Sequence, residues 1–225
     1  VDPSAIEFFK LGNMLRVTKD VWDEQTYIDE CFTAWRKWSG TEEEGFWIDM
    51  DMIPFGQLQL MSPPGKDTSR SVFAKGDIAL AGKGVRRWSQ LSDSQMRTFI
   101  SMRALAASPL MMGGDLPSLD DFSLALITDP DMLACNQNGV MGFLVYENGG
   151  IETWKSLEKG QICSGWIGVF NRTEKLISVT VNSALLGLEL HTNYRLLDIW
   201  EDRLINAGSR VQIEPNGVLF IKFSG

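Results

Sequence analysis

The chain has 225 residues, of which 44% are hydrophobic and 22% are charged, a composition that suits one large or two medium-sized globular domains. Its formal net charge of −8 argues against nucleic acid and anionic membranes as partners, because both attract basic surfaces. No apolar stretch approaches the length that is needed to span a bilayer.

The cysteines and the single histidine do not form a metal or nucleophile motif. Cys31, Cys135 and Cys163 are widely spaced and include no CxxC pair, so they indicate buried apolar side chains rather than a zinc cluster or a disulfide framework. The lone His191 lies in a β-rich region, where a structural role is more common than a catalytic one. We therefore expect any chemistry to depend on carboxylates, with no metal or other cofactor.

The sequence begins with Val-Asp-Pro-Ser and carries neither an initiator methionine nor a signal peptide. We interpret it as a fragment or a processed product. Secreted, periplasmic and cytoplasmic locations are all compatible with this sequence.

Residues 1–133 alternate between helical and extended patterns. Apolar spacing, caps and breakers predict helices over residues 2–11, 22–38, 92–107 and 118–128, and strands over residues 13–18, 45–51 and 110–115. Asp2 and Pro3 suit the start of the first helix, and Ser92 with Gln95 forms a capping box. Residues 54–90 are too many for an ordinary connection, so they predict an elaborated loop. Strands that alternate with helices predict a parallel sheet.

Each of the three predicted strands ends in acidic residues, namely Asp20, Asp49 with Asp51, and Asp115. In parallel α/β folds, functional groups collect at the carboxyl ends of strands. Arg16 has the same strand parity as Asp20, so the two side chains share a face. The pattern therefore predicts one shared pocket.

Simpler structural roles also fit each of these acids. Arg16 and Asp20 are equally compatible with an ion pair that closes the end of a strand. Strand-end capping is somewhat favoured for Asp49 and Asp51, and Asp115 could cap the helix that follows it.

After about residue 140 the pattern changes to short extended runs separated by turns. These runs cover residues 143–146, 165–170, 176–181, 194–199, 209–213 and 218–223. They predict an antiparallel β-sandwich over residues 139–225, which follows the α/β part over residues 1–138.

Taken together, these motifs resemble glycoside hydrolase family 27, the α-galactosidase and α-N-acetylgalactosaminidase group. The likeness covers essentially the whole chain and rests on the order and spacing of several segments. The segment LRVTKDVWD is similar to strand six of the family, and FWIDMDMI is similar to its strand-seven motif W-N-D-P-D-M-L. Residues 91–116 are similar to its strand-eight segment with A-P-L-[LM]-x-G-x-D. Residues 129–137, which end in N-Q, and LLDIWEDRLI in the β-region complete the likeness.

The resemblance implies that this chain is the C-terminal half of a (β/α)8 barrel enzyme followed by a β-sandwich. It implies a retaining α-galactosidase-like glycosidase in which Asp20 is the acid/base residue. Arg16, Trp47, Asp51 and Met52 match residues that bind the sugar or organise its pocket. Because an acid catalyst needs a raised pKa, we expect partial burial of Asp20.

The resemblance also implies a missing partner. The segment Y-x-K-x-D, which carries the nucleophile at the end of strand four in the family, does not occur in this chain. We expect five barrel strands and the nucleophile to come from elsewhere in the same polypeptide or from a companion chain. The expected substrate is an oligosaccharide or a glycoconjugate.

Two departures keep alternatives open. Ile48 and Met50 replace the N and P of the strand-seven motif, and the loop over residues 54–90 is longer than in the commonest members. A carbohydrate-binding protein that has kept the fold and lost its activity is the main alternative. A barrel hydrolase similar to the α-galactosidases of family 36 is a further one.

Overall fold

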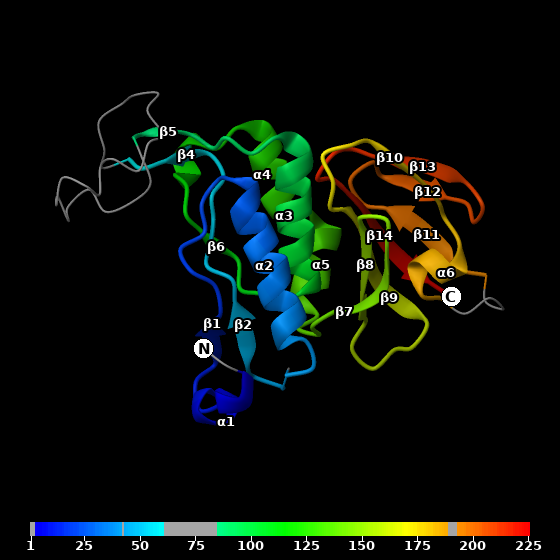
Figure 1. The fold of residues 1–225 in the computed structure, drawn as a ribbon, viewed down its shortest axis with the longest axis horizontal. Helices are drawn as coiled ribbons and strands as arrows, with labels where there is room; N and C mark the ends of the chain where they lie inside the picture. The colour runs from blue at the N-terminus through cyan, green and yellow to red at the C-terminus, as the bar shows by residue number, and fades with distance from the viewer. Residues whose placement is uncertain (1–2, 42, 61–84, 189–192) are drawn as a thin grey trace.

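The computed structural model describes residues 3–41, 43–60, 85–188 and 193–225. Within these ranges, a part built of helices and short strands lies beside a part built mainly of strands (Figure 1). Asp2, His191 and residues 61–84 of the predicted loop lie outside the described residues.

Two pairs of short parallel strands organise the first part. β1 (Met14–Arg16) pairs with β2 (Trp47–Asp49), and β3 (Met52–Ile53) pairs with β6 (Met111–Met112). Because β3 follows β2 after two residues, the strands lie in the order β1, then β2 with β3, then β6. Neighbouring parallel strands in chain order are the arrangement expected of one side of a (β/α)8 barrel. The predicted parallel sheet is therefore confirmed.

Two long helices cover one side of these strands. α2 (Gln25–Trp38) follows β1, and α3 (Asp93–Leu105) precedes β6. The predicted capping box opens α3, because the Ser92 hydroxyl accepts from the Gln95 amide and the Gln95 side chain accepts from the Ser92 amide. The strand residues that point toward these helices, such as Ile48, are fully buried.

Shorter helices surround this arrangement. The predicted first helix is a 3-10 turn (Pro3–Ala5) followed by α1 (Ile6–Phe9). α4 (Asp121–Thr128) is capped by Asp120 and so begins three residues later than the helix predicted over residues 118–128. The remaining elements of this part were not predicted as such; they are the 3-10 turn Leu116–Ser118, α5 (Pro130–Gln137), and the antiparallel pair β4 (Gln57–Leu58) and β5 (Arg87–Trp88).

The second part contains a six-stranded antiparallel sheet with the order β12-β11-β14-β9-β8-β7. A two-stranded antiparallel sheet, β10 with β13, and the short helix α6 (Ser183–Leu186) accompany it. β8 and β12 were missed by the sequence reading, whereas the antiparallel β-module itself is confirmed. The bounds are β7 (Phe143–Asn148), β8 (Ile151–Leu157), β9 (Ser164–Asn171), β10 (Ile177–Thr180), β11 (Arg195–Asp198), β12 (Arg203–Ile205), β13 (Arg210–Ile213) and β14 (Val218–Ser224).

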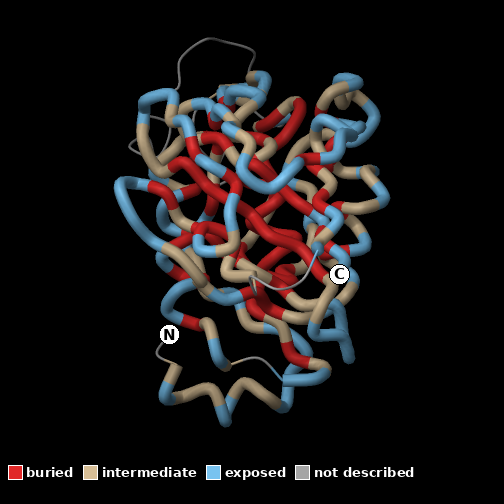
Figure 2. The backbone as a smooth tube through the Cα atoms, turned by 90° about the vertical axis from the view of Figure 1, so that its right-hand side faces the viewer, coloured by how far each residue is buried: buried red, intermediate tan, exposed pale blue. Residues whose placement is uncertain are grey.

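The two faces of the six-stranded sheet contribute to different hydrophobic clusters. One face packs on α2 and α3, where the rings of Trp35 and Trp154 stack with their centroids 3.9 Å apart. The Trp35 indole also donates a hydrogen bond of 3.0 Å to the carbonyl of Gly142. The other face packs against β10 and β13 through residues such as Ile167 and Ile213. The buried residues, drawn in red, run through the middle of the molecule (Figure 2). The sheet and the helical part therefore share one hydrophobic core.

Candidate functional site

Arg16 lies at the end of β1 and contacts two carboxylates. Its Nη2 atom is 2.6 Å from Oδ1 of Asp20 and 3.1 Å from Oδ2 of Asp51. β1 pairs in parallel with β2, and the register places Arg16 beside Asp49, just before Asp51. The expected convergence of Arg16, Asp20 and Asp51 at the carboxyl ends of neighbouring strands is thus present in the structure.

The two carboxylates around Arg16 differ in their environments. The Asp20 side chain is 81% exposed and accepts a hydrogen bond from Arg16. The Asp51 side chain is 18% exposed and also accepts a 2.7 Å hydrogen bond from the amide of the buried Val21. The partial burial that was expected for Asp20 is not found in this chain, because no described residue covers its side chain.

Asp51 sits in a sharp change of backbone direction between β2 and β3. Its φ of 71° lies in the left-handed region, which non-glycine residues seldom occupy, although aspartate is among the more tolerant. Its amide donates a 2.8 Å hydrogen bond to Oδ1 of Asp49, which is the Asx-type turn that aspartates commonly stabilise. Asp49 therefore has the strand-end role that its pattern favoured.

Met52 follows this turn and lies against the loop after β6. A Cβ atom at Gly113 would lie 2.3 Å from the Met52 sulfur, and one at Gly114 would lie 1.6 Å from the Phe55 carbonyl oxygen. Only glycine fits this close approach, so the two glycines before Asp115 allow Met52 to lie over the strand end. Met52 thus follows Asp51 directly in the chain, and its side chain lies against Gly113.

Trp47 and Asp115 do not join the cluster. Trp47 is at the amino end of β2, opposite Met14, and its indole nitrogen lies near Gly139 after α5. Asp115 accepts a 2.6 Å hydrogen bond from the Ser118 hydroxyl and precedes the 3-10 turn Leu116–Ser118. That contact agrees with the structural reading of Asp115.

Arg103 supports the turn at Asp51 and was missed in the sequence. Its side chain is fully buried, and it donates hydrogen bonds to the carbonyls of Met50, Asp51 and Met52. Burial lowers its pKa from the ordinary value of arginine. A signal was present, because Arg103 lies four residues after Phe99 on the apolar stripe of a predicted helix.

Asp23 and Arg87 form another ion pair near the same end of the strands, and this one is buried. Asp23 accepts from Arg87 through both Nη2 and, at 3.1 Å, Nε, and it also accepts a 2.9 Å hydrogen bond from the Gln90 amide. The Arg87 guanidinium lies 5.9 Å from the centre of the Trp22 ring. This contact ties β5, at the end of the predicted loop, to the segment between Asp20 and α2.

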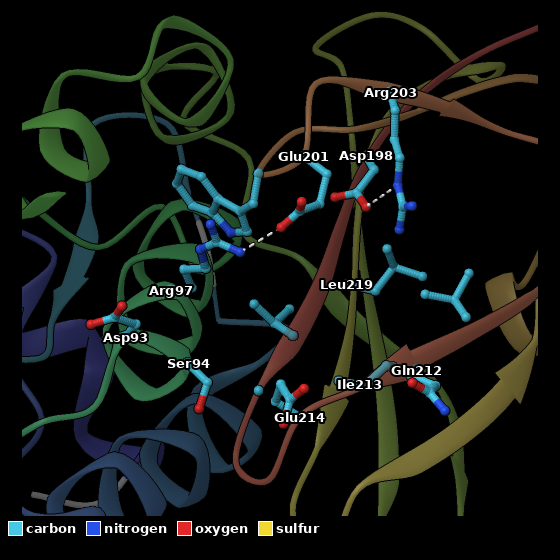
Figure 3. A pocket seen from close by; sticks show the side chains of 14 residues that line it. Asp93, Ser94, Arg97, Asp198, Glu201, Arg203, Gln212, Ile213, Glu214 and Leu219 are labelled. Atoms are coloured by element: carbon cyan, nitrogen blue, oxygen red, sulfur yellow. Dashed lines mark hydrogen bonds and ion pairs between the residues drawn. The ribbon is translucent and has the colours of Figure 1, made fainter.

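A separate hollow of about 340 Å³ lies between the start of α3 and the β-module (Figure 3). Arg97 pairs with Glu201 at 2.7 Å, and Arg203 contacts Asp198 at 3.5 Å. Burial raises the pKa of Asp198 above its ordinary value. The Arg97–Glu201 pair spans the hollow, whereas the Arg203–Asp198 pair lies within the β-module. The hollow therefore includes a polar contact between the two parts of the chain, and we do not assign it as a ligand site.

The described residues do not offer a metal site or a membrane-spanning helix. No group of three or more histidine, cysteine or acidic side chains among them is arranged to hold a metal ion. Across the same residues, no helix is both long and apolar enough to cross a membrane.

Comparison by sequence finds α-galactosidases, although no protein-family model matches the chain. Alpha-galactosidase 2 of Arabidopsis thaliana is 23% identical over 194 residues, and the α-galactosidase of Cyamopsis tetragonoloba is 25% identical over 198 residues. Each match covers 85% of this chain but only 40% and 39% of the respective relatives. The chain thus spans about two fifths of the length of these curated relatives.

Comparison of structures finds enzymes of the same group. A family 27 β-L-arabinopyranosidase from Geobacillus stearothermophilus has a TM-score of 0.78 at 26% identity, over 95% of this chain and 45% of that chain. A putative α-N-acetylgalactosaminidase from Bacillus halodurans has a TM-score of 0.73 at 21% identity, over 92% of this chain and 44% of that chain, and shows the shared fold. The predicted likeness to glycoside hydrolase family 27 is confirmed, and this chain corresponds to the C-terminal part of such barrel enzymes.

Proposed function

Because the chain is similar in sequence and fold to the C-terminal part of family 27 enzymes, we propose that it forms part of a retaining α-glycosidase. The observation that carries the proposal is the contact of Arg16 with Asp20 and Asp51 at the carboxyl ends of neighbouring parallel strands. This end of a barrel is where active sites of this fold are built. Within the described residues, the carboxylate of Asp20 is left open at this end of the strands.

The roles of the individual residues follow from their surroundings. Asp20 donates a proton to the leaving glycosidic oxygen and later removes one from the attacking water. Arg16 orients Asp20 and Asp51, and its guanidinium has further donors for a sugar hydroxyl. Met52, the residue after Asp51, provides an apolar surface for the sugar ring. We leave Trp47 out of this set, because the strand register places it at the opposite end of β2.

The nucleophile belongs to the part of the barrel that these residues do not include. A retaining mechanism needs a second carboxyl group about 5–5.5 Å from the acid/base group. Asp51 is already bound by Val21 and Arg16, which makes it a poor candidate for attack on a sugar carbon. We propose that the remaining strands, with the nucleophile, come from the same polypeptide or from a companion chain.

The substrate class is a terminal α-D-galactoside or a sugar of the same ring configuration. Two matched relatives are α-galactosidases, and one matched structure is a β-L-arabinopyranosidase. An α-D-galactopyranoside and a β-L-arabinopyranoside have the same arrangement of ring hydroxyls and differ by one hydroxymethyl group. The two sugars therefore form the natural pair for a comparison of activity.

The test uses the polypeptide that contains this chain together with the rest of the barrel, and nitrophenyl glycosides of both sugars. We expect hydrolysis of at least one of them, and we expect Asp20→Ala to lower kcat by roughly 10²–10⁴-fold on substrates with poor leaving groups. Activated leaving groups need less help from an acid, so their loss should be smaller. Glu174→Gln, an exposed acid in a turn of the β-module, is the matched control and should behave as the wild type.

Three results would contradict the proposal or part of it. Unchanged turnover of both kinds of substrate by Asp20→Ala would remove Asp20 from the mechanism. Sugar binding without hydrolysis by the wild-type protein would favour a carbohydrate-binding protein, a reading that the altered strand-seven motif also allows. Full activity of residues 1–225 alone, as a folded monomer, would refute the need for a nucleophile from outside them.

A further inference from the structure

Arg103 is a buried cation in the last turn of α3, and no acidic side chain among the described residues lies at ion-pair distance from it. Its side chain has no solvent exposure, and Phe99 lies under it with 4.8 Å between the guanidinium carbon and the ring centre. An unpaired buried charge is costly unless hydrogen bonds replace its hydration. The contacts of Arg103 therefore need to be strong and specific.

Three consecutive backbone carbonyls supply these contacts. Nη1 of Arg103 donates to the Asp51 carbonyl at 2.6 Å, and Nη2 donates to the Met52 carbonyl at 3.1 Å and to the Met50 carbonyl. In a regular strand, successive carbonyls point in opposite directions across the strand. Three in a row converge on one guanidinium only where the extended backbone is interrupted, and the left-handed conformation of Asp51 is that interruption.

The guanidinium and the turn are held by further polar contacts. The Met50 amide donates to the Ser108 hydroxyl at 3.1 Å, and the Asn136 amide group donates to the Ser108 carbonyl at 2.9 Å. These bonds link the turn to the end of α3 and to α5. Residues from three elements thus fix the backbone around Asp51.

The conformation of Asp51 decides where its carboxylate lies. From this turn, Oδ2 reaches the Val21 amide at 2.7 Å and Arg16 at 3.1 Å. Arg16 in turn contacts Asp20 at 2.6 Å. A continuous series of contacts therefore leads from buried Arg103 to the exposed carboxylate.

We propose that Arg103 is a positioning residue, whose bonds to three carbonyls hold Asp51 so that it orients Arg16 and, through Arg16, Asp20. Arg103 does not touch Asp20 or Arg16 and takes no part in proton transfer. The functional consequence rests on the proposed glycosidase, whereas the structural consequence does not.

The first measurement is independent of enzyme activity and uses the polypeptide that contains residues 1–225, labelled with ¹⁵N. In Arg103→Met, which keeps a long apolar side chain but removes the donors, we expect the Val21 amide resonance to lose the downfield shift of a carboxylate-bonded N–H. The Arg16 guanidinium signals should lose their slowed exchange with water. Arg103→Lys keeps a cation with fewer fixed donors and should restore part of both signals.

Arg97→Met is the matched control, because Arg97 is on the same helix and pairs with Glu201 away from the turn. It should leave the Val21 and Arg16 signals unchanged. If Arg103→Met also leaves them unchanged, or if Arg97→Met alters them equally, the proposal is wrong. If Arg103→Met does not fold, Arg103→Lys tests the proposal instead. Val21 and Arg16 signals identical to the wild type in Arg103→Lys would show that the bonds to three carbonyls are not required, and would refute the proposal.

The second measurement uses the complete enzyme. A small displacement of the catalytic geometry can cost about 100-fold in rate, so Arg103→Met should lower kcat by up to about that factor with a smaller change in KM. Partial recovery of kcat in Arg103→Lys is expected. Altered NMR signals with unchanged kcat would refute the functional step, while an inactive wild type with altered signals would count against the proposed function alone.

Discussion

Substitutions of Asp51 should separate the contribution of its backbone from that of its carboxylate. Asp51→Asn keeps a side chain that tolerates the left-handed region and an oxygen that can accept from the Val21 amide. It loses the charge that faces Arg16, but the Arg16 side chain is 41% exposed and keeps Asp20. Exposed ion pairs contribute about 0–1 kcal/mol, so we expect the free energy of unfolding to fall by no more than that.

Asp51→Ala should cost much more, because two terms add. The buried Val21 amide loses a charged acceptor, which costs about 1.5–3 kcal/mol. Alanine in the left-handed region adds about 1 kcal/mol of backbone strain. The sum is about 2.5–4 kcal/mol. Asp51→Gly avoids the strain and should fall between the other two variants.

Urea unfolding followed by tryptophan fluorescence measures these differences. With a slope of about 2–3 kcal/mol per molar urea, the alanine variant should lower the midpoint by about 1–2 M and the asparagine variant by less than about 0.5 M. An alanine variant as stable as the asparagine variant would refute the reasoning, because neither the Val21 hydrogen bond nor the left-handed backbone would then matter. A glycine variant less stable than alanine would refute the strain term specifically.

Two further predictions concern groups outside the cluster. Cys31 is buried, and burial raises the pKa of its thiol to about 11. A thiol reagent should therefore label the partly exposed Cys163 first and Cys31 only on unfolding. Equal labelling rates of the two cysteines in the native protein would contradict this. Because burial raises the pKa of Asp198, the folded state binds its proton more tightly than the unfolded state, and ionisation costs stability above the folded pKa. That cost is relieved as pH falls through the folded pKa toward the ordinary value. Between about pH 7 and about pH 4, the free energy of unfolding of the wild type should therefore rise relative to that of Asp198→Asn, as denaturation at each pH would measure. Identical pH dependence of the two proteins would contradict this prediction.

Local sequence signals predicted the elements whose causes are local. The capping box of α3 and the alternation of helices with acid-tipped strands were visible, because caps and periodicity involve residues a few positions apart. α5 was missed although Asp129 before Pro130 is a good start signal for a helix. β8 was missed because its Glu152 and Lys155 interrupt an otherwise β-like run.

The support of the site could not be predicted, because it depends on contacts between residues distant in sequence. Arg103 binds the Asp51 carbonyl, 52 positions away, and Ser108 binds the Met50 amide, 58 positions away. Neither contact produces a recognisable sequence pattern, because backbone carbonyls and amides are present at almost every residue. The sequence offered only an arginine on an apolar stripe, and the fold shows what that cation binds.

The surroundings of the two carboxylates assign them different tasks. Asp51 is bound by the Val21 amide and by Arg16, and its backbone is held by Arg103, so it is fixed in both position and charge. Asp20 is mostly exposed and is held by Arg16 through a single contact. A group that exchanges protons with a substrate must be accessible, and a group that orients it must be rigid. This asymmetry favours Asp20 for proton transfer and Asp51 for orientation, and it explains why one arginine at the end of a strand needs two acidic neighbours.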